Sequence, residues 1–470
     1  MTHTPASRTG WGDLLAEGRL PRFALICLGV WLNAVDALVT ATIMPSVGTD
    51  LGGYAYFSWA VAIYLVGANL AGASAGRLSE IFGLRQASAL SGLVCIAGCI
   101  LSAVAPNVAV FLIGRLIQGM SCGWISGFSM VAIALLFPER HLARVFASVS
   151  GVWGVATMLG PLVGGVFAEA GAWRGVFWLF AGQAALFSVA ALWLLRGSDR
   201  PAGGSDVPWT QLAVLSVGVG AIAAADVIPR VWAALALVAV GIAILALVLR
   251  LDARARVRLL PHQAGDLRTV VGSGYAAMFW MTAASMGFAI YGPPILQTLR
   301  NMSPLRAGYV IGVESIAWTL AALVVASASE KWDAFWVRSG AVCLVLSLVL
   351  LSWAMSDGPL AWVLVGGALL GAAFGLSWSF MTRRIMAALS DEERAIGTSA
   401  TNAIRQTGAS AGAAISGAAA NLVGLSAGLT TQSAQEAAVW VFASVIPLAL
   451  VGAWAAFRLT GSATRVARAA

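Results

Sequence analysis

The sequence predicts an all-α polytopic membrane protein with 14 transmembrane helices, and three observations support this fold class. The chain of 470 residues is 60% hydrophobic and 10% charged, with a mean hydropathy of +0.86, whereas soluble domains carry about 25% charged residues. Fourteen apolar segments are each long enough to cross a hydrocarbon core of about 30 Å. The basic residues are also distributed unevenly among the loops that join these segments.

The apolar segments follow one another with short polar connections. Their centres lie near positions 34, 66, 96, 121, 155, 185, 221, 240, 281, 317, 346, 370, 408 and 444. At about 1.5 Å per residue, each is long enough to span the membrane as a helix. The seventh is the weakest, because Asp226, Pro229 and Arg230 crowd its end. We expect Asp226 to pair with Arg230 at the interface.

A polar linker divides the chain after the sixth segment. It reads GSDRPAGGSDVP and is rich in the small residues and prolines of flexible linkers. The predicted organisation is a cytoplasmic tail at 1–22, a six-helix half at 23–197, a linker at 198–208, two extra helices at 209–251, a cytoplasmic connection at 252–268, a second six-helix half at 269–459 and a cytoplasmic tail at 460–470.

The basic residues predict the orientation of the chain. With the N-terminus inside, 22 of the 28 Lys and Arg residues fall in inner segments and 4 in outer loops. Arg115 and Arg405 lie within predicted helices. This excess on one side predicts that both termini lie in the cytoplasm, and we expect the protein to lie in a bacterial-type inner membrane. The net charge of +8 is therefore a topology signal, and no nucleic-acid partner is expected.

The fifth segment contains GVWGVATMLGPLVGG, positions 151–165. A proline and paired glycines are tolerated in a membrane helix because neighbouring helices satisfy the freed backbone groups and pack closely. The string resembles the fifth-helix signature of proton-driven antiporters of the major facilitator superfamily. The matching positions, with one upstream glycine, are Gly154, Gly160, Pro161, Gly164 and Gly165. The alternative is a generic glycine-rich packing face.

This resemblance implies a major facilitator fold with two six-helix halves. The two extra central helices are typical of the superfamily's fourteen-helix branch of drug:proton antiporters. Such transporters work by alternating access, in which the two halves rock about a central site.

The connection between the second and third segments reads GRLSEIFGLR. It resembles the superfamily's motif Gly-x-Leu-x-Asp-x-x-Gly-Arg-Lys, with Glu in place of Asp and Leu in place of the first basic residue. Its glycines suit a tight turn, and its charges suit a pair or a helix-end interaction. We predict a conformational gating loop formed by Gly76, Glu80, Gly83 and Arg85. The alternative is a plain polar cytoplasmic loop.

Two charged residues are predicted within the membrane on the first and fourth helices. Asp36 lies about 21 Å from the inner face and therefore about 9 Å from the outer face of the hydrocarbon core. Arg115 lies about 12 Å from the outer end of its helix, so the two residues are at similar depth. LIGRLIQG around Arg115 resembles an antiporter motif with an arginine four residues before a glycine. A carboxylate beside a cation can change between charged and neutral states. We therefore predict that Asp36 and Arg115 couple transport to protons; alternatively, Asp36 only solvates the outer mouth.

Two further charged residues belong to the second half. Glu314 on the tenth helix lies about 12 Å from the outer end, so its depth matches that of Asp36. It is predicted to take part in proton coupling, the alternative being a cavity wall residue that does not titrate. Arg405, in an Arg-Gln-x-Gly string, is either a buried functional arginine or a residue at the inner water boundary.

Three tryptophans on central helices are candidates for cavity walls, where their faces would meet aromatic or cationic substrates. They are Trp31, Trp124 and Trp318, and core packing is the alternative. The five cysteines lie in apolar segments without neighbouring histidines or carboxylates. They are therefore expected to be buried residues and not metal ligands. No cofactor and no metal site are expected.

The resemblance implies a proton-coupled secondary transporter that exports a small amphipathic or cationic molecule, without enzyme activity. Its expected partners are the small-molecule substrate, protons and the lipid bilayer. We expect a monomer, and a periplasmic adaptor is left open as a partner. The alternatives are a proton-coupled importer or uniporter on the same fold, or a lipid-handling membrane protein.

Overall fold

The computed structural model describes residues 19–466, apart from positions 138, 198–206, 226–227, 229, 327 and 391–392. The first 18 residues, most of the predicted linker and the last four residues therefore lie outside the described part of the chain. The expected pair of Asp226 with Arg230 also falls outside it.

The described residues form fifteen α-helices and three short 3-10 helices. The first six α-helices are α2 (Arg19–Leu51), α3 (Phe57–Phe82), α4 (Leu84–Ala103), α5 (Val108–Leu136), α6 (Glu139–Glu169) and α7 (Arg174–Leu194). A hairpin of α8 (Trp209–Ala225) and α9 (Val231–Arg254) follows.

Seven α-helices complete the chain. They are α10 (Val270–Arg300), α11 (Pro304–Val325), α12 (Asp333–Ala354), α13 (Leu360–Ala387), α14 (Arg394–Leu422), α15 (Thr431–Ala443) and α16 (Ile446–Val466). The 3-10 helices are η1 (Tyr54–Tyr56), η2 (Glu330–Trp332) and η3 (Leu425–Ala427).

Ten segments within the described residues are long and apolar enough to cross a membrane, and two further apolar helices are shorter. The fold is thus all-helical and polytopic, while the count of fourteen spans stays a prediction. The last expected segment, centred near position 444, consists of two helices, α15 and α16. Pro447 explains the break, because it lies in the first turn of α16 and lacks the N–H that would continue α15.

Local sequence signals explain several helix starts. Asn107 and Thr269 each accept a hydrogen bond from a backbone N–H three residues further on. Ser303 does the same for α11, with Pro304 at the first helical position. Thr430 and Ser433 form a reciprocal capping box at α15. Such caps satisfy backbone donors that the helix itself leaves unpaired.

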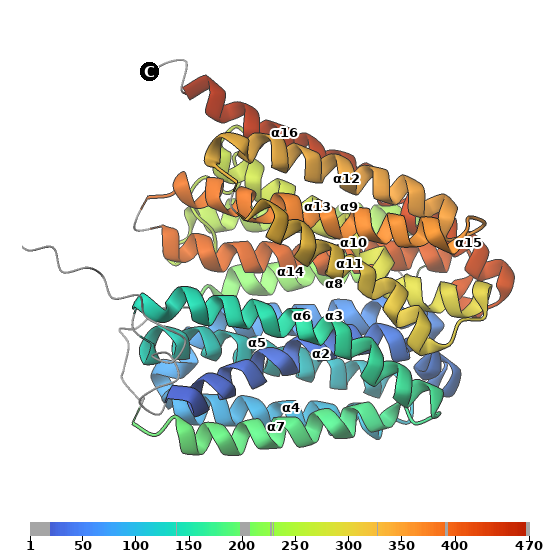
Figure 1. The fold of residues 1–470 in the computed structure, drawn as a ribbon, viewed down its shortest axis with the longest axis horizontal. Coiled ribbons are helices and arrows are strands. Elements are labelled where there is room, and N and C mark those ends of the chain that lie inside the picture. Colours follow the sequence, from blue (N-terminus) through green and yellow to red (C-terminus); the bar gives the residue numbers. More distant parts are fainter. Residues whose placement is uncertain are drawn as a thin grey trace, which may run out of the picture.

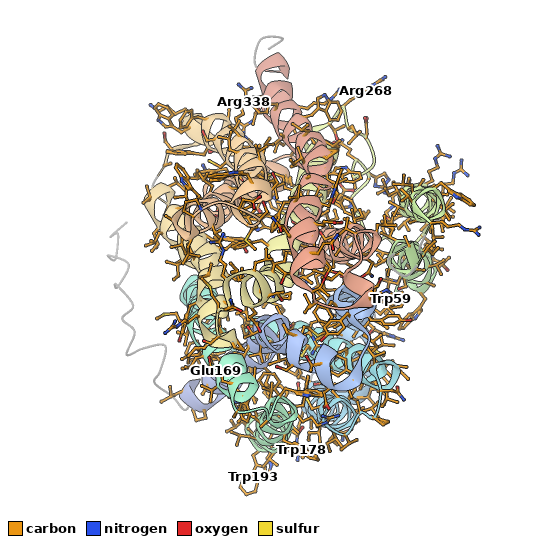
Figure 2. The ribbon with its side chains drawn as sticks, turned by 90° about the vertical axis from the view of Figure 1, so that its right-hand side faces the viewer. Trp59, Glu169, Trp178, Trp193, Arg268 and Arg338 are labelled. Atoms are coloured by element: carbon orange, nitrogen blue, oxygen red, sulfur yellow. The ribbon has the colours of Figure 1, made fainter. Side chains whose placement is uncertain are left out.

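The helices form two groups that lie one above the other. Figure 1 shows α2–α7 along one side of the bundle and α10–α16 along the other, with the long axes of most helices running in the same direction. Figure 2 looks along these axes and shows α8 and α9 standing at one side of the bundle. Trp178 and Trp193 point away from the bundle (Figure 2) and are 51% and 68% exposed, as suits a lipid-facing surface.

The α8–α9 hairpin packs against both groups of helices, α2–α7 and α10–α16. Ile222 and Ala223 of α8 pack against Ala411 and Ala414 of α14, and Trp59 of α3 joins the same apolar cluster. The hairpin therefore covers the seam between the two groups of helices.

The connection after α9 is held by one buried carboxylate. Asp252 accepts hydrogen bonds from the backbone N–H groups of Leu259 (2.6 Å) and Leu260 (2.9 Å), and from the Gln211 side chain of α8 (3.3 Å). The His262 backbone N–H then donates to Glu393, next to the start of α14 (2.9 Å). The connection is thus fastened to the second group of helices.

Candidate functional site

Asp36 lies in the middle of α2, surrounded by apolar residues of the helix bundle. Only 4% of its surface is exposed. Two of its helix neighbours, Val35 and Val39, are buried in the main hydrophobic core. An isolated ionised carboxylate at such a position is costly, by several kcal/mol, unless a partner compensates its charge.

Arg115 of α5 is that partner. Its Nη1 donates to both carboxylate oxygens of Asp36, at 2.8 and 2.9 Å, and its Nε donates to the Ala60 carbonyl of α3 at 3.2 Å. Arg115 itself is 1% exposed. The structure therefore brings together two residues that sequence reasoning placed at similar depth on different helices.

Polar residues that carry no net charge complete the surroundings of Arg115. Gln118, one turn further along α5, accepts a hydrogen bond from Arg115 Nη1 and donates to Ser102 Oγ of α4 at 3.1 Å. The Tyr64 ring of α3 lies under the guanidinium, with its centroid 4.6 Å from Arg115 Cζ. The guanidinium is therefore held by a carboxylate, an amide, a carbonyl and an aromatic face.

The Tyr64 hydroxyl extends this arrangement to a second polar pair. It donates to Asn33 Oδ1 of α2 at 2.8 Å, and Asn33 Nδ2 donates to Ser126 Oγ of α5 at 3.0 Å. Sequence reasoning missed Tyr64, Asn33, Ser126 and Gln118. The available signal was weak: each is a polar residue within a segment that is otherwise apolar.

The energetics of this centre make the charge state of Asp36 important. Removing one partner from a buried ion pair costs about 3–5 kcal/mol, because the other charge stays buried without compensation. Adding a proton to Asp36 removes the negative charge that Arg115 faces and has a comparable electrostatic effect on the pair. The centre can therefore change its hydrogen bonds when a proton binds or leaves.

Glu314 lies apart from this pair, on α11 in the second group of helices. Glu314 is partly exposed, and its carboxylate makes no hydrogen bond or ion pair among the described residues. Helix α13 passes very close, since a Cβ at Gly371 would lie 1.8 Å from the Glu314 carbonyl oxygen. Arg405 of α14 donates to Asn402 at 3.2 Å in the same helix.

The three candidate tryptophans lie in different surroundings. Trp318, one turn after Glu314, stacks on Phe374 with ring centroids 5.0 Å apart and also contacts Trp378. Trp124 donates from Nε1 to Ser74 Oγ of α3 at 2.9 Å. Trp31 is half-buried and packs against the main core. An exposed role in a cavity stays a prediction for all three.

The predicted gating loop is helical except at one residue. Gly76 and Glu80 lie in the last turns of α3, Arg85 lies in the first turn of α4, and Gly83 separates the two helices. Gly83 has φ 77°, a conformation that residues with a side chain rarely adopt. Glu80 pairs with Arg77 at 3.2 Å. Arg85 donates to the Leu192 carbonyl near the end of α7 at 2.8 Å, so it ties α4 to α7.

The glycines of α6 lie at contacts with two other helices. A Cβ at Gly160 would lie 2.8 Å from Leu38 Cβ of α2, and one at Gly164 would lie 3.1 Å from Thr42 Cβ. A Cβ at Gly165 would lie 2.6 Å from the Leu305 Cα of α11. At Gly154, by contrast, no atom lies within 4 Å of such a Cβ.

These contacts close one end of the bundle, which we call the outer end, following the orientation predicted from the basic residues. It comprises positions 50–57, 165–174, 300–306 and 421–428. Within about one helical turn of these positions, α6 also meets α11 through Pro161 and Gly308, where a Cβ added to Gly308 would lie 2.7 Å from the Pro161 Cβ. Asn421, the penultimate residue of α14, donates to the Ala55 carbonyl of η1 at 2.7 Å. The two groups of helices are therefore in contact at the outer end.

Comparison with known proteins adds a family and several relatives. A family model described as the Major Facilitator Superfamily matches residues 26–413. A "Probable multidrug-efflux transporter" of Mycobacterium tuberculosis (strain ATCC 25618 / H37Rv) is 26% identical over 438 residues, covering 90% of this chain and 92% of that protein. The "Multidrug transporter protein MdtP" of Bacillus subtilis (strain 168) is 22% identical over 418 residues, covering 86% and 76%.

Solved structures share the fold at lower identity. A peptide transporter POT in complex with sulfate has a TM-score of 0.68 at 16% identity, covering 94% of this chain and 95% of its own. A D-xylose-proton symporter has a TM-score of 0.64 at 17% identity, with coverage of 94% and 97%. At these identities the likeness shows the fold alone.

Proposed function

Because the chain belongs to the Major Facilitator Superfamily, and is thus a multi-pass membrane transporter and not an enzyme, we propose that it exports small amphipathic or cationic molecules in exchange for protons. Its environment is the lipid bilayer and its substrate a small molecule. The proposal places the protein in a bacterial-type inner membrane with fourteen spans and both termini in the cytoplasm, in line with the excess of basic residues on one side.

The observation that carries the proposal is the buried pair of Asp36 with Arg115. Asp36 is 4% exposed and its partner Arg115 is 1% exposed. A pair buried this deeply adds little net stability to the fold, because the cost of removing both charges from water offsets most of their attraction. Such a pair is better explained as a site that takes up and releases a proton. In the proposed cycle a proton enters Asp36 from outside and leaves it to the cytoplasm.

The contacts at the outer end support alternating access. Gly165 against Leu305 and Pro161 against Gly308 bring α6 and α11 together there, and Asn421 bonds to Ala55. A transporter that exports must open this end to release its substrate and close it again to accept the next molecule. Contacts between small residues can separate and re-form without leaving buried charges unpaired.

Glu314 and the aromatic group beside it support the preference for cationic molecules. The Glu314 side chain has no hydrogen bond or ion pair among the described residues, so its oxygens are available to a ligand. Trp318 and Phe374 present stacked rings one turn away. A carboxylate and aromatic faces together attract organic cations. The names of the two multidrug relatives describe those proteins only; they support the export of drug-like small molecules and do not state the charge of the substrate.

The test uses everted membrane vesicles that carry the protein and an imposed pH gradient, acidic inside. Ethidium and tetraphenylphosphonium serve as cationic probes, and a neutral amphipathic dye serves as a comparison. We expect both cations to accumulate in the vesicles and the accumulation to collapse when nigericin removes the pH gradient. Accumulation that is independent of the gradient, or absent for both cations, overturns the proposal.

Two variants then locate the coupling. Asp36→Asn keeps an oxygen that accepts from Arg115 but removes the titration, and it should abolish gradient-driven accumulation of ethidium. Asp50→Asn is the matched control, because Asp50 lies on the same helix and also pairs with an arginine, Arg174, but is exposed at the outer end. This variant should transport like the parent. Equal transport by both variants would place the coupling site elsewhere.

A further inference from the structure

An open groove lies on the outward surface of α12, at the end of the bundle opposite to the outer end. It has a volume of about 690 Å³, and its walls come from η2 and the first three turns of α12. Lys331 and Arg338 supply its charged groups, and Trp332, Phe335 and Val342 belong to its apolar part. The groove therefore offers cationic and apolar side chains to the same ligand.

Exposed apolar residues continue from the groove along the same face of α12. Phe335, Val342, Leu346 and Val349 follow one another at spacings of seven, four and three residues, and each exposes 44–54% of its surface. Such spacings place side chains on one face of a helix. Because α12 is long and apolar enough to cross a membrane, this face meets the acyl chains of lipids. A molecule in the groove therefore has its apolar part beside the hydrocarbon core.

Arg338 is held at the groove by α16. Its Nε donates to Thr460 Oγ1 at 2.9 Å, and its Cζ lies 5.3 Å from the centroid of the Phe457 ring. Figure 2 shows Arg338 at the periphery of the bundle. Its partners among the described residues are thus a hydroxyl and an aromatic ring, and neither carries a negative charge. A cation at the membrane boundary is costly without a compensating charge, and both Nη groups of Arg338 are available to an anion.

The acidic residue of α12 serves other cations. Asp333 is 3% exposed and pairs with Arg383 and Arg384 of α13. Lys331, two residues before Asp333, is exposed and makes no hydrogen bond or ion pair among the described side chains. The groove therefore carries two positive charges that no described carboxylate neutralises.

We propose that this groove binds an anionic phospholipid, with its phosphate against Lys331 and Arg338 and an acyl chain along Phe335 and Val342. Arginine binds phosphate through its fork of N–H donors, and lysine adds a point charge. Trp332 suits the same level, because tryptophan is enriched where headgroups meet the hydrocarbon core. Basic pockets between membrane helices on the cytoplasmic side are known to bind anionic headgroups.

The charge of the groove separates it from the proposed transport site. Lys331 and Arg338 repel cationic molecules, whereas the carboxylates of Asp36 and Glu314 attract them. The bilayer also presents phospholipids to the exposed face of α12 at all times. A lipid therefore fits both the charge and the position of the groove, and a cationic substrate fits neither.

The test measures which lipid occupies the groove of the full-length protein. Leu346→Cys, one turn beyond Val342 on the exposed face, carries a bimane label in a background without the five native cysteines. The protein is reconstituted into phosphatidylcholine bilayers to which either phosphatidylglycerol or phosphatidylcholine with an acyl-chain quencher is added. Each cation should strengthen binding of an anionic headgroup about fivefold, so phosphatidylglycerol should be preferred at the label about 25-fold.

Variants of the two cations locate the preference. Lys331→Gln and Arg338→Gln should each lower it about fivefold, and the double variant should remove it. The matched control combines Arg254→Gln with Arg268→Gln, because both arginines are exposed at the same end of the bundle but lie outside the groove. This control should keep the full preference. Lys331 is exposed and unpaired among the described side chains, so Lys331→Gln decides the proposal even where Arg338→Gln folds poorly.

Four outcomes would overturn the proposal. Two are equal quenching by both lipids in the parent protein and an undiminished preference in the double variant. Another is loss of the preference when inorganic phosphate replaces chloride at constant ionic strength, because the cations would then bind free phosphate and not a lipid. The last is a label that neither lipid quenches, since a second copy of the chain would then cover the groove. None of these measurements involves proton coupling, so this inference and the proposed function succeed or fail separately.

Discussion

Gly165→Ala is the substitution that most directly tests the contact between α6 and α11 at the outer end. The added Cβ would lie 2.6 Å from Leu305 Cα and 2.8 Å from its Cβ, whereas ordinary contacts begin at 3.4 Å. The two helices must therefore separate by about 0.8 Å here, and because the nearest atom is backbone, no side-chain rotation relieves the clash. Overpacking of this kind costs about 1–3 kcal/mol.

That cost falls on the state in which the outer end is closed. A change of 1–3 kcal/mol shifts a two-state equilibrium by about 5- to 150-fold. Alanine is also the better helix former, by about 0.5–1 kcal/mol, so α6 itself is not weakened. We therefore expect Gly165→Ala to fold normally but to favour a state with the outer end open, and to transport more slowly.

The assay is the distance between two spin labels across the contact. Glu169→Cys at the end of α6 and Arg306→Cys in the first turn of α11 are both exposed positions (Glu169 is labelled in Figure 2), in a background that lacks the five native cysteines. Double electron–electron resonance should show a larger population of long distances in Gly165→Ala. The control is Gly154→Ala on the same helix, where an added Cβ meets nothing within 4 Å. Identical distance distributions in the two variants would refute the reasoning.

Two further predictions concern stability. Asp252→Ala leaves the N–H groups of Leu259 and Leu260 without their acceptor, at a cost of about 1–3 kcal/mol each. Trypsin should therefore cut the connection after α9 at least tenfold faster. Asp266→Ala in the same connection removes only an exposed hydrogen bond, from the Arg268 backbone N–H at 2.8 Å, and should change the rate far less. Gly83→Ala places a side chain at φ 77° and should lower the free energy of unfolding by about 1–3 kcal/mol. Gly182→Ala on α7 is the control and should not lower the free energy of unfolding, because an added Cβ there meets open space. Equal melting temperatures of Gly83→Ala and Gly182→Ala would contradict the assignment of strain to Gly83.

Depth along a helix was predictable from the sequence, but the rotation of one helix against another was not. Counting residues from the helix ends placed Asp36 and Arg115 at similar depth, because a helix rises by a constant distance per residue. Whether the two side chains face each other depends on how α2 and α5 are turned. Tyr64 illustrates the limit: a single polar aromatic residue in an apolar segment gives no indication of which helix it will face.

Helix starts were also predictable from the local sequence, whereas the effect of a proline on a helix was not. Asn107, Thr269 and Ser303 are typical N-cap residues, and each starts a helix in the structure. Pro447 could have predicted the break between α15 and α16, yet Pro161 interrupts nothing, since α6 continues through it. A proline ends a helix in one place and is accommodated in another because its surroundings decide whether the freed carbonyl finds a partner. Those surroundings belong to the tertiary structure and cannot be predicted from the local sequence around the proline.

The glycines of α6 connect the outer end to the buried pair through α2. Gly160 and Gly164 press against Leu38 and Thr42, which lie within two turns of Asp36 on the same helix. Thr42 also reaches the other half, since an added Cβ at Gly308 of α11 would lie 3.4 Å from its hydroxyl oxygen. Side chains this closely packed cannot shift independently. Any rotation of α2 that follows a change in the Asp36–Arg115 pair must therefore displace α6 against α11, which is the contact that closes the outer end. In the proposed exporter, proton binding and opening would then be two consequences of one movement of α2.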